Sequence, residues 1–409
     1  MSDWQGQPPS IFLAYRGVHQ IAQMAIAANE MHQLSRYCCS AINLPGKWGH
    51  RLPGLRNSLL ANPISSDRLP PEKVVELPLP NALSSVLTRL SFDRRKASWW
   101  ANRWFEDIAI SKLSRLPEKP SIVVGAETCA LHLFQSAKSR GMKCMLDCHG
   151  IPTVFIDEAI QRAADEFNLP RPSPLDSAEM SEKKALERNL ADVLVFCSEL
   201  QRNIWVQLGV PPEKCQAIPL WVDADYWQRS TPPPTLAKGE PLKVAAVGAG
   251  TLSKGLPYLL QAAKRLGDSI QLSLVGRIAE ELQPMVGEIS TPVHHLPFLS
   301  RPQLRDFFST QHLLVMPSLG DSFGFIAMEA MACGLPVIVT THTGAPVPNP
   351  SWRVPAHDGA AIASRIKDYL DHPEHLPIDS ATARAFASQF TPQRYRDQIK
   401  ETYRELLAS

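Results

Sequence analysis

Two carboxylates stand close together in a stretch of the chain that is otherwise largely apolar. Asp321 lies in a loop, and Glu329 follows it with seven residues between them. Glu329 has Ala327, Met328 and Ala330 as neighbours, so the segment is too apolar for a solvent-facing helix. A buried carboxylate needs hydrogen-bond donors, and the two hydroxyls of a ribose would supply them. The plainer interpretation, in which Asp321 caps a helix and Glu329 faces water, stays open on spacing alone.

The loop that carries Asp321 follows a predicted strand that ends at Met316. Ligands of open α/β sheets bind just beyond the carboxyl ends of strands, so this loop lies where a ligand would bind. A helix is expected to open near Gly324, and its free N–H groups and partial positive charge suit a phosphate. We therefore expect Ser322, Phe323 and Gly324 to contact such a ligand.

A glycine-rich turn follows another predicted strand, Lys243–Val247. It contains Gly248, Gly250 and Lys254, which would place backbone N–H groups and one cation near a phosphate. Such a turn is weak evidence by itself, because similar turns serve only for packing. A dinucleotide-binding oxidoreductase is the least favoured interpretation, since Ser253 stands where a third glycine would be needed.

Apolar runs alternate with helical patterns along most of the chain, which is typical of βαβ units and parallel sheets. The fold class predicted is α/β. Strands are expected at Ile11–Tyr15, Ser121–Gly125, Lys143–Asp147, Ala191–Cys197, Lys243–Val247, Ile270–Val275, His312–Met316 and Pro336–Val339. Helices are expected at Ala22–Arg36, Cys129–Arg140 and Pro392–Leu407.

A chain of 409 residues is long enough for two domains. The proline-rich run at 231–235 cannot continue a helix or a central strand, so the boundary is expected within 224–242. We predict a first Rossmann-like domain at 1–224, a second at 225–385 and a terminal helix at 386–409.

Composition excludes some classes of function. The 42 Lys and Arg against 40 Asp and Glu give a net charge of +2, too small for whole-chain capture of nucleic acid. No stretch approaches the ~20 apolar residues of a membrane span, and Met1–Gln5 lacks the layout of a signal peptide. A cytoplasmic protein is expected. Its eight scattered cysteines are expected to be reduced and mostly buried.

The segment 94–105 combines basic and aromatic residues, with Trp100, Trp104 and Ile108 on one helical face. A helix lying on a membrane surface would have this composition. So would an ordinary helix that packs its tryptophans on a core and turns its basic residues to water. We favour the second interpretation.

The run from Pro317 to Pro336 resembles the hallmark loop and helix of retaining glycosyltransferase family four, whose fold is GT-B. The similarity extends over most of the chain from about Ser121, and Val247–Leu260 looks like the family's donor-phosphate loop. It implies two Rossmann-like domains facing across a cleft, with the C-terminal helix crossing back to the first. It also implies an enzyme that transfers a hexose-type sugar from a nucleotide sugar, with retention and without cofactor or metal.

The resemblance also implies roles for individual residues. Asp321 would hold the donor sugar, Glu329 the ribose and Lys254 the phosphates, while His149 matches a histidine at the acceptor side of the cleft. In the family both acids of the motif are glutamates, and the first of them stands where this chain has Asp321; the family also has an arginine where Ala249 stands. Arg277 is our candidate to replace that missing cation. The first turn, Tyr15–His19, lacks the family's glycine pair, so the acceptor loop is atypical.

Several alternatives remain at this stage. A nucleotide-sugar epimerase or a phosphorylase of the same fold would use a similar donor site. A catalytically silent nucleotide-sugar-binding protein is favoured by the Asp321 and Ala249 departures. The nucleotide base, the donor sugar, the acceptor and the oligomeric state do not follow from the sequence.

One motif argues for a metal. Asp223 and Asp225 form an Asp-x-Asp triplet, and carboxylates together with phosphate oxygens suit Mg²⁺ or Mn²⁺. The triplet lies at the start of the predicted linker, however, far along the chain from Lys254 and Gly324. Aspartates in such positions more often cap turns, so no metal site is predicted.

Overall fold

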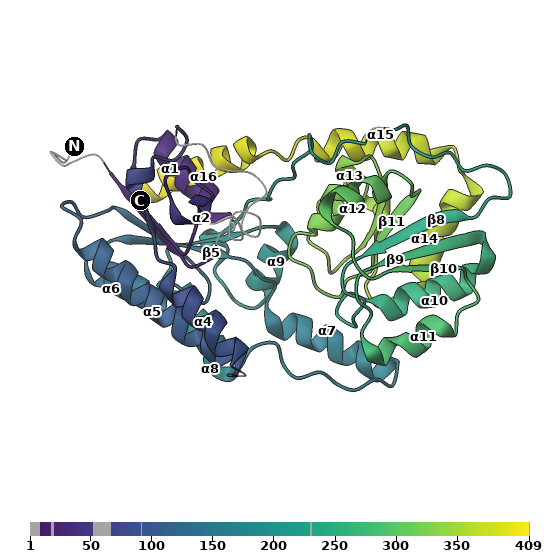
Figure 1. The fold of residues 1–409 in the computed structure, drawn as a ribbon, viewed down its shortest axis with the longest axis horizontal. Helices are drawn as coiled ribbons and strands as arrows, with labels where there is room; N and C mark the ends of the chain where they lie inside the picture. Colours follow the sequence, from purple (N-terminus) through teal and green to yellow (C-terminus); the bar gives the residue numbers. More distant parts are fainter. Residues whose placement is uncertain (1–8, 18–19, 52–66, 91, 230, 409) are drawn as a thin grey trace.

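A computed structural model describes residues 9–17, 20–51, 67–90, 92–229 and 231–408. Met1–Gln5 and the Val18 and His19 positions of the first turn lie outside the described residues. The chain forms two parallel sheets, each in its own half and each covered by helices (Figure 1).

The first sheet has seven strands in the order β3-β2-β1-β4-β5-β6-β7. They are β1 (Ile11–Tyr15), β2 (Leu34–Cys39), β3 (Val74–Glu76), β4 (Ile122–Ala126), β5 (Lys143–Cys148), β6 (Val193–Phe196) and β7 (Cys215–Ala217). The helices of this half are α1 (Ile21–Glu30), α2 (Trp48–Arg51), α4 (Leu79–Arg89), α5 (Arg94–Ser114), α6 (Leu131–Ser139), α7 (Thr153–Glu166), α8 (Ala178–Leu190) and α9 (Glu199–Gln207).

Side chains of β1 alternate between two cores, as the period of a strand requires. Ile11 and Leu13 pack with α1 on one face of the sheet. Phe12 and Ala14 pack on the other face with α5 and α6. Both faces of the sheet are therefore buried, which explains why β1, β4 and β6 are nearly continuous apolar runs.

The second sheet has six strands in the order β10-β9-β8-β11-β12-β13. They are β8 (Leu242–Val247), β9 (Ile270–Val275), β10 (Val293–Leu296), β11 (Leu313–Met316), β12 (Val337–Thr340) and β13 (Arg353–Val354). The helices are α10 (Leu256–Leu266), α11 (Gln283–Gly287), α12 (Arg301–Phe308), α13 (Phe325–Ala332), α14 (Gly359–Asp371), α15 (His375–Ala387) and α16 (Pro392–Ala408).

The strand predictions are confirmed at every predicted position to within a few residues, but one predicted helix extends too far. The helix predicted over Ala22–Arg36 is present as α1 and ends at Glu30, and the rest of the predicted range reaches into β2. His32 adopts the left-handed conformation with φ 59°, which turns the chain after α1. Leu34–Cys39 then pairs with β1 as a strand, so tertiary pairing overrides the local helical pattern.

The packing of the tryptophans of α5 differs from the interpretation that we favoured. The face that α5 buries contains Ala97, Ala101 and Phe105, whose spacing of four places them on one side of the helix. Trp100 and Trp104 lie on an exposed side instead. Small alanines let the helix approach the sheet closely, and this leaves the tryptophans facing solvent.

The terminal helix α16 packs against α1 of the first half. Tyr403 donates a hydrogen bond from its hydroxyl to the carbonyl of Met24, and the Arg396 guanidinium contacts the Glu30 carboxylate at 2.9 Å. The helix before it, α15, packs on α13 of the second half. Figure 1 shows this C-terminal stretch, in yellow, running along the upper side of the molecule from one half to the other. Domain boundaries near 224 and 385 remain our proposal.

All eight cysteines are free and buried, as predicted. None of the described helices is long and apolar enough to cross a membrane.

Candidate functional site

A pocket of about 180 Å³ opens at the carboxyl edge of the second sheet. There β8 and β11 are neighbours in the sheet although they are far apart in the chain. The chain leaves β8 toward β9 on one side and leaves β11 toward β12 on the other side. Such a switch point is the usual ligand site of an open parallel sheet. The loops after β8, β9 and β11 and the first turn of α13 line the pocket.

Two glycines let these loops approach through their backbones. Gly255 has φ +70°, and a Cβ added there would lie 1.9 Å from the carbonyl oxygen of Pro317. A Cβ on Gly276 would lie 2.1 Å from the carbonyl oxygen of Gly248. Real side chains do not fit at such distances, so the shape of the pocket wall depends on both glycines. Gly248 and Gly250, which the sequence predicted, both line the pocket.

The structure brings Lys254 and Asp321 into direct contact. The Lys254 ammonium lies 2.7 Å from Oδ2 of Asp321, and both residues line the pocket. The other carboxylate oxygen of Asp321 accepts a hydrogen bond from the N–H of Gly324 at 2.7 Å. Asp321 therefore caps the start of α13, as the plainer interpretation had it, and also presents a carboxylate to the pocket.

The first turn of α13 lies at the same pocket. Gly324 has φ +71° and turns the chain from the loop into the helix. Phe325 and Ile326 follow it and line the pocket, and the N–H groups that open a helix have no partner within it. Together with Lys254, these groups form a setting for an anion.

Glu329 lies one helical turn after Phe325 and Ile326, on the same face of α13. Its side chain is half-buried, and no described residue forms a hydrogen bond with its carboxylate. Burial raises the pKa of Glu329 to about 7, against the lowering effect of the Arg301 charge. A half-buried carboxylate beside the pocket without a donor is suited to receive the hydroxyls of a ligand.

Ser322 and Phe323 hold the loop without lining the pocket. The Ser322 hydroxyl oxygen accepts a hydrogen bond of 3.0 Å from the N–H of Ile151, so it joins the two halves of the molecule. Phe323 is buried and packs its ring edge-on against Phe325. In the structure these two residues make positioning contacts, and the ligand contacts expected from the sequence stay a prediction.

Arg277 is not brought to the pocket. Its side chain is 87% exposed, and its guanidinium lies 3.9 Å from the Glu280 carboxylate, which is equally exposed. Arg277 contacts the loop after β8 through its backbone, because its carbonyl accepts a hydrogen bond from the N–H of Gly250. Of the residues that line the pocket, Lys254 supplies the cation, and Ala249 leaves the second cation position apolar.

His149 lies at the carboxyl edge of the first sheet, after β5. Its Nδ1 is 3.3 Å from Oδ2 of Asp147 and 3.1 Å from the amide nitrogen of Gln20. Burial disfavours the protonated ring, but the charge and hydrogen bond of Asp147, together with the charges of Glu127 and Glu187, outweigh it and raise the pKa of His149. The ring of Tyr15 packs beside it at 5.0 Å. Asp147 and Gln20 were not predicted from the sequence as partners of His149. The only indication in the sequence was that Asp147 places a carboxylate at the end of a predicted apolar strand.

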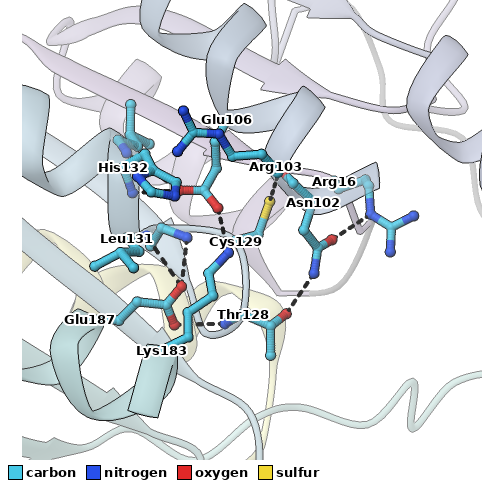
Figure 2. A network of polar contacts seen from close by, with 12 residues as sticks. Arg16, Asn102, Arg103, Glu106, Thr128, Cys129, Leu131, His132, Lys183 and Glu187 are labelled. Carbon is cyan, nitrogen blue, oxygen red and sulfur yellow. Dashed lines mark hydrogen bonds and ion pairs between the residues drawn. The ribbon is translucent and has the colours of Figure 1, made fainter. Parts of the chain in front are cut away.

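A buried polar network supports the neighbouring turn after β4 (Figure 2). Lys183 and Glu106 form an ion pair of 2.6 Å with almost no exposure. Glu187 accepts hydrogen bonds from the N–H groups of Thr128, Ala130 and Leu131. Buried ions require such compensation, and here it fixes the turn to α5 and α8.

The Asp-x-Asp triplet forms a turn. Oδ1 of Asp223 accepts a hydrogen bond from the N–H of Tyr226 at 3.1 Å, which is the capping role expected from sequence. Within the described ranges, no group of three or more His, Cys, Asp and Glu residues is arranged to hold a metal ion.

Comparisons with known proteins agree with this geometry. Residues 241–372 match the family described as Glycosyl transferases group 1. The chain is 33% identical over 164 residues to a D-inositol 3-phosphate glycosyltransferase of Streptomyces scabiei, covering 37% of this chain and 36% of the relative. It is 27% identical over 227 residues to the putative colanic acid biosynthesis glycosyltransferase WcaL of Salmonella typhimurium, covering 51% and 55%. The chain thus spans about half or less of these relatives' length.

Solved structures resemble nearly the whole chain. Anabaena HepE in complex with UDP superposes with a TM-score of 0.61 at 14% identity, covering 97% of this chain and 100% of that one. Sucrose-phosphate synthase of Thermosynechococcus elongatus has a TM-score of 0.64 at 16% identity, covering 98% and 100%. These likenesses confirm the fold, two Rossmann-like halves in the GT-B arrangement.

Proposed function

We propose that this protein transfers a hexose-type sugar from a nucleotide-sugar donor to an acceptor. Residues 241–372, which match the family described as Glycosyl transferases group 1, support this proposal. The observation that carries the proposal is the pocket at the switch point of the second sheet. It combines the Lys254 cation and the first turn of α13, and the half-buried Glu329 carboxylate lies one helical turn further along α13. These three features match the diphosphate and the ribose of a nucleotide sugar.

The leaving group is the main electrostatic problem of the reaction. When the bond between the anomeric carbon and the phosphate oxygen breaks, the nucleoside diphosphate takes the electron pair and its negative charge grows. Lys254 and the N–H groups of Phe325 and Ile326 are placed to stabilise that charge. The same charges replace a divalent metal in our proposal.

Retention of configuration belongs to the same proposal. The acceptor oxygen would attack the anomeric carbon from the face that the diphosphate leaves, and its proton would pass to the leaving phosphate oxygen. Asp321 would hold donor hydroxyls. Asp321 contacts Lys254 at 2.7 Å. When a donor binds, the two side chains would therefore either keep this ion pair while both contact the donor, or separate. His149, held by Asp147, would lie on the acceptor side.

The base of the nucleotide is the first question to test. The structure of Anabaena HepE was solved with UDP and with UDP-glucose, so we propose uridine as the first candidate. Calorimetry with UDP, GDP and ADP should show binding of one of them, and Glu329→Ala should weaken it. Hydrolysis of the matching nucleotide sugar, followed by proton NMR of the anomeric position, then tests turnover and retention. Failure of all three nucleotides to bind would exclude the proposal.

A second candidate function is supported by one observation. Ala249 leaves the pocket with a single lining cation, and that cation is paired with Asp321. A protein that binds nucleotide sugars without turning them over would tolerate this arrangement. Nucleotide binding without any hydrolysis or transfer would favour that function. A cytoplasmic location stays a prediction.

A further inference from the structure

Helix α4 exposes an apolar stripe along its length. Leu79, Leu83, Val86 and Leu90 are exposed, and Leu90 reaches 73%. Their spacing of four, three and four residues places them on one face of a helix. An amphipathic helix of a globular protein ordinarily turns such a face to the core. Here α4 packs on α5 by its other side, and the stripe faces solvent.

The neighbouring helix α5 adds aromatic side chains to this surface. Trp100 is 61% exposed, Trp104 follows one turn later, and Phe92 is exposed between the two helices. Figure 1 shows α4 and α5 side by side on the outer side of the first sheet, opposite α1 and α16. Exposed large apolar residues gathered in this way mark an interaction site.

The charges on this surface are predominantly positive. Arg89, Arg94, Arg95 and Lys96 are exposed, and none forms an ion pair with a described residue. The two nearby exposed carboxylates are already engaged, since Asp93 caps α5 and Asp107 pairs with Arg103. Unpaired cations beside exposed tryptophan, phenylalanine and leucine suit an anionic headgroup layer above an acyl region.

From these observations we propose that the exposed faces of α4 and α5 dock the protein onto an anionic lipid bilayer. Charge distinguishes this occupant from a second copy of the chain. A symmetric dimer through this surface would bring its unpaired cations against one another, which disfavours association. An anionic bilayer provides the complementary charge and accepts the apolar stripe at the same time.

The docking surface is connected to the acceptor side of the molecule. Arg16, in the turn after β1, donates hydrogen bonds to Asn81 of α4 at 2.6 Å and to Ser98 and Asn102 of α5 at 2.9 and 2.7 Å. Asn102 in turn donates to Thr128 after β4 (Figure 2). Both turns lie at the carboxyl edge of the first sheet, close to His149.

This connection bears on the class of acceptor. A bilayer bound by α4 and α5 would lie beside the edge of the first sheet that carries His149. The acceptor would then be a hydroxyl of a membrane-held lipid or lipid-linked glycan. That statement about the acceptor rests on the proposed function, whereas bilayer docking does not.

Flotation of the full-length protein with vesicles tests docking. Vesicles of phosphatidylcholine alone are compared with vesicles that also contain phosphatidylglycerol, at low and high salt. We expect binding to the anionic vesicles that weakens with salt. The double variants Leu90→Ser/Trp100→Ser and Arg89→Ser/Arg94→Ser should each lower the partition coefficient roughly tenfold or more.

The matched control is Ile378→Ser, which removes an apolar side chain that is 61% exposed on α15 of the other half. It should bind vesicles as the unchanged protein does. Circular dichroism and UDP binding show whether each variant is folded, and their retention separates docking from the donor site. Docking is refuted if the unchanged protein ignores anionic vesicles, or if folded double variants bind them equally well. Loss of a dimer in the double variants, without vesicle binding, would also refute it.

Discussion

At the scale of single residues, Lys254 links the donor loop to the loop after β11. Its ammonium contacts Asp321 at 2.7 Å, and both side chains keep some exposure, so the pair adds little to stability. Its role is therefore expected in turnover. Lys254→Ala should lower kcat by roughly 10²–10³ and change KM less, because leaving-group charge grows toward the transition state.

Steady-state kinetics of donor hydrolysis measures this effect. The control is Lys264→Ala, which removes an exposed lysine of α10, the helix that follows the loop of Lys254. It should keep the original kcat. A rise in KM with unchanged kcat would mean that Lys254 binds ground state and transition state equally.

We expect Glu329 to make nucleotide binding depend on pH. Burial raises its pKa to about 7 in the empty site, and ribose hydroxyls would donate to its ionised form. The bound pKa is then lower than the free pKa, binding releases a proton, and affinity rises with pH through 7. Between pH 6 and pH 8 this group should tighten UDP binding about tenfold.

The comparison is made by calorimetry on the unchanged protein and on Glu329→Gln. The titration of the UDP phosphates is common to both proteins, so the difference between the two pH profiles isolates Glu329. Parallel profiles would show that this carboxylate does not hold the ribose.

At the scale of elements, Gly255 sets how closely α10 approaches the loop after β11. A methyl group there meets the Pro317 carbonyl at 1.9 Å and also meets a φ of +70°. Gly239 separates the two effects, because its φ is +87° while nothing lies within 4 Å of an added Cβ. Gly239→Ala should cost about 1 kcal/mol of unfolding free energy from backbone strain.

Gly255→Ala should cost roughly 2 kcal/mol or more beyond that, since the loop must also move. Urea unfolding measures both variants, and UDP binding should weaken only in Gly255→Ala. Equal unfolding free energies for the two variants would mean that the loops do not depend on this contact.

The elements that could be predicted are those whose pattern of apolar residues lies within one short stretch of the sequence. Strands such as β11 and β12 are buried at every position and are visible as apolar runs. Residues 34–39 carry Ser35 and Arg36 on partly exposed positions, so β2 has no such run and depends on pairing with β1. Trp100 is exposed because another face of α5 packs on the sheet. The pattern of basic and aromatic residues in the sequence does not show which face that is.

At the scale of the whole molecule, the site residues at the second sheet were easier to predict from the sequence than those at the first sheet. Gly248, Lys254 and Asp321 belong to loops of one sheet whose motifs lie in short stretches, and the structure places all three around one pocket. Asp147 and Gln20 lie 127 positions apart, and only the fold of the first sheet brings them to His149. The exposed position of Arg277 likewise depends on a loop that has no local signal.

The segments that cross between the halves bear on whether a metal takes part. Asp223 lies in the crossing that follows β7, where the Val222 N–H donates to the Phe390 carbonyl and the Trp221 ring packs on Tyr395. Its carboxylate caps the turn at Tyr226, so its role belongs to the crossing and not to the pocket. In the proposed reaction, Lys254 and the opening of α13 would supply the positive charge that a metal would bring to the diphosphate.

We therefore predict that hydrolysis or transfer keeps nearly its full rate after exhaustive EDTA treatment. Asp223→Asn should leave UDP affinity unchanged and lower the free energy of unfolding by about 1 kcal/mol, because a neutral amide oxygen accepts the Tyr226 N–H less strongly than a carboxylate. Loss of activity in EDTA that Mn²⁺ restores would show that the leaving diphosphate is stabilised by a cation that the residues of this pocket do not supply.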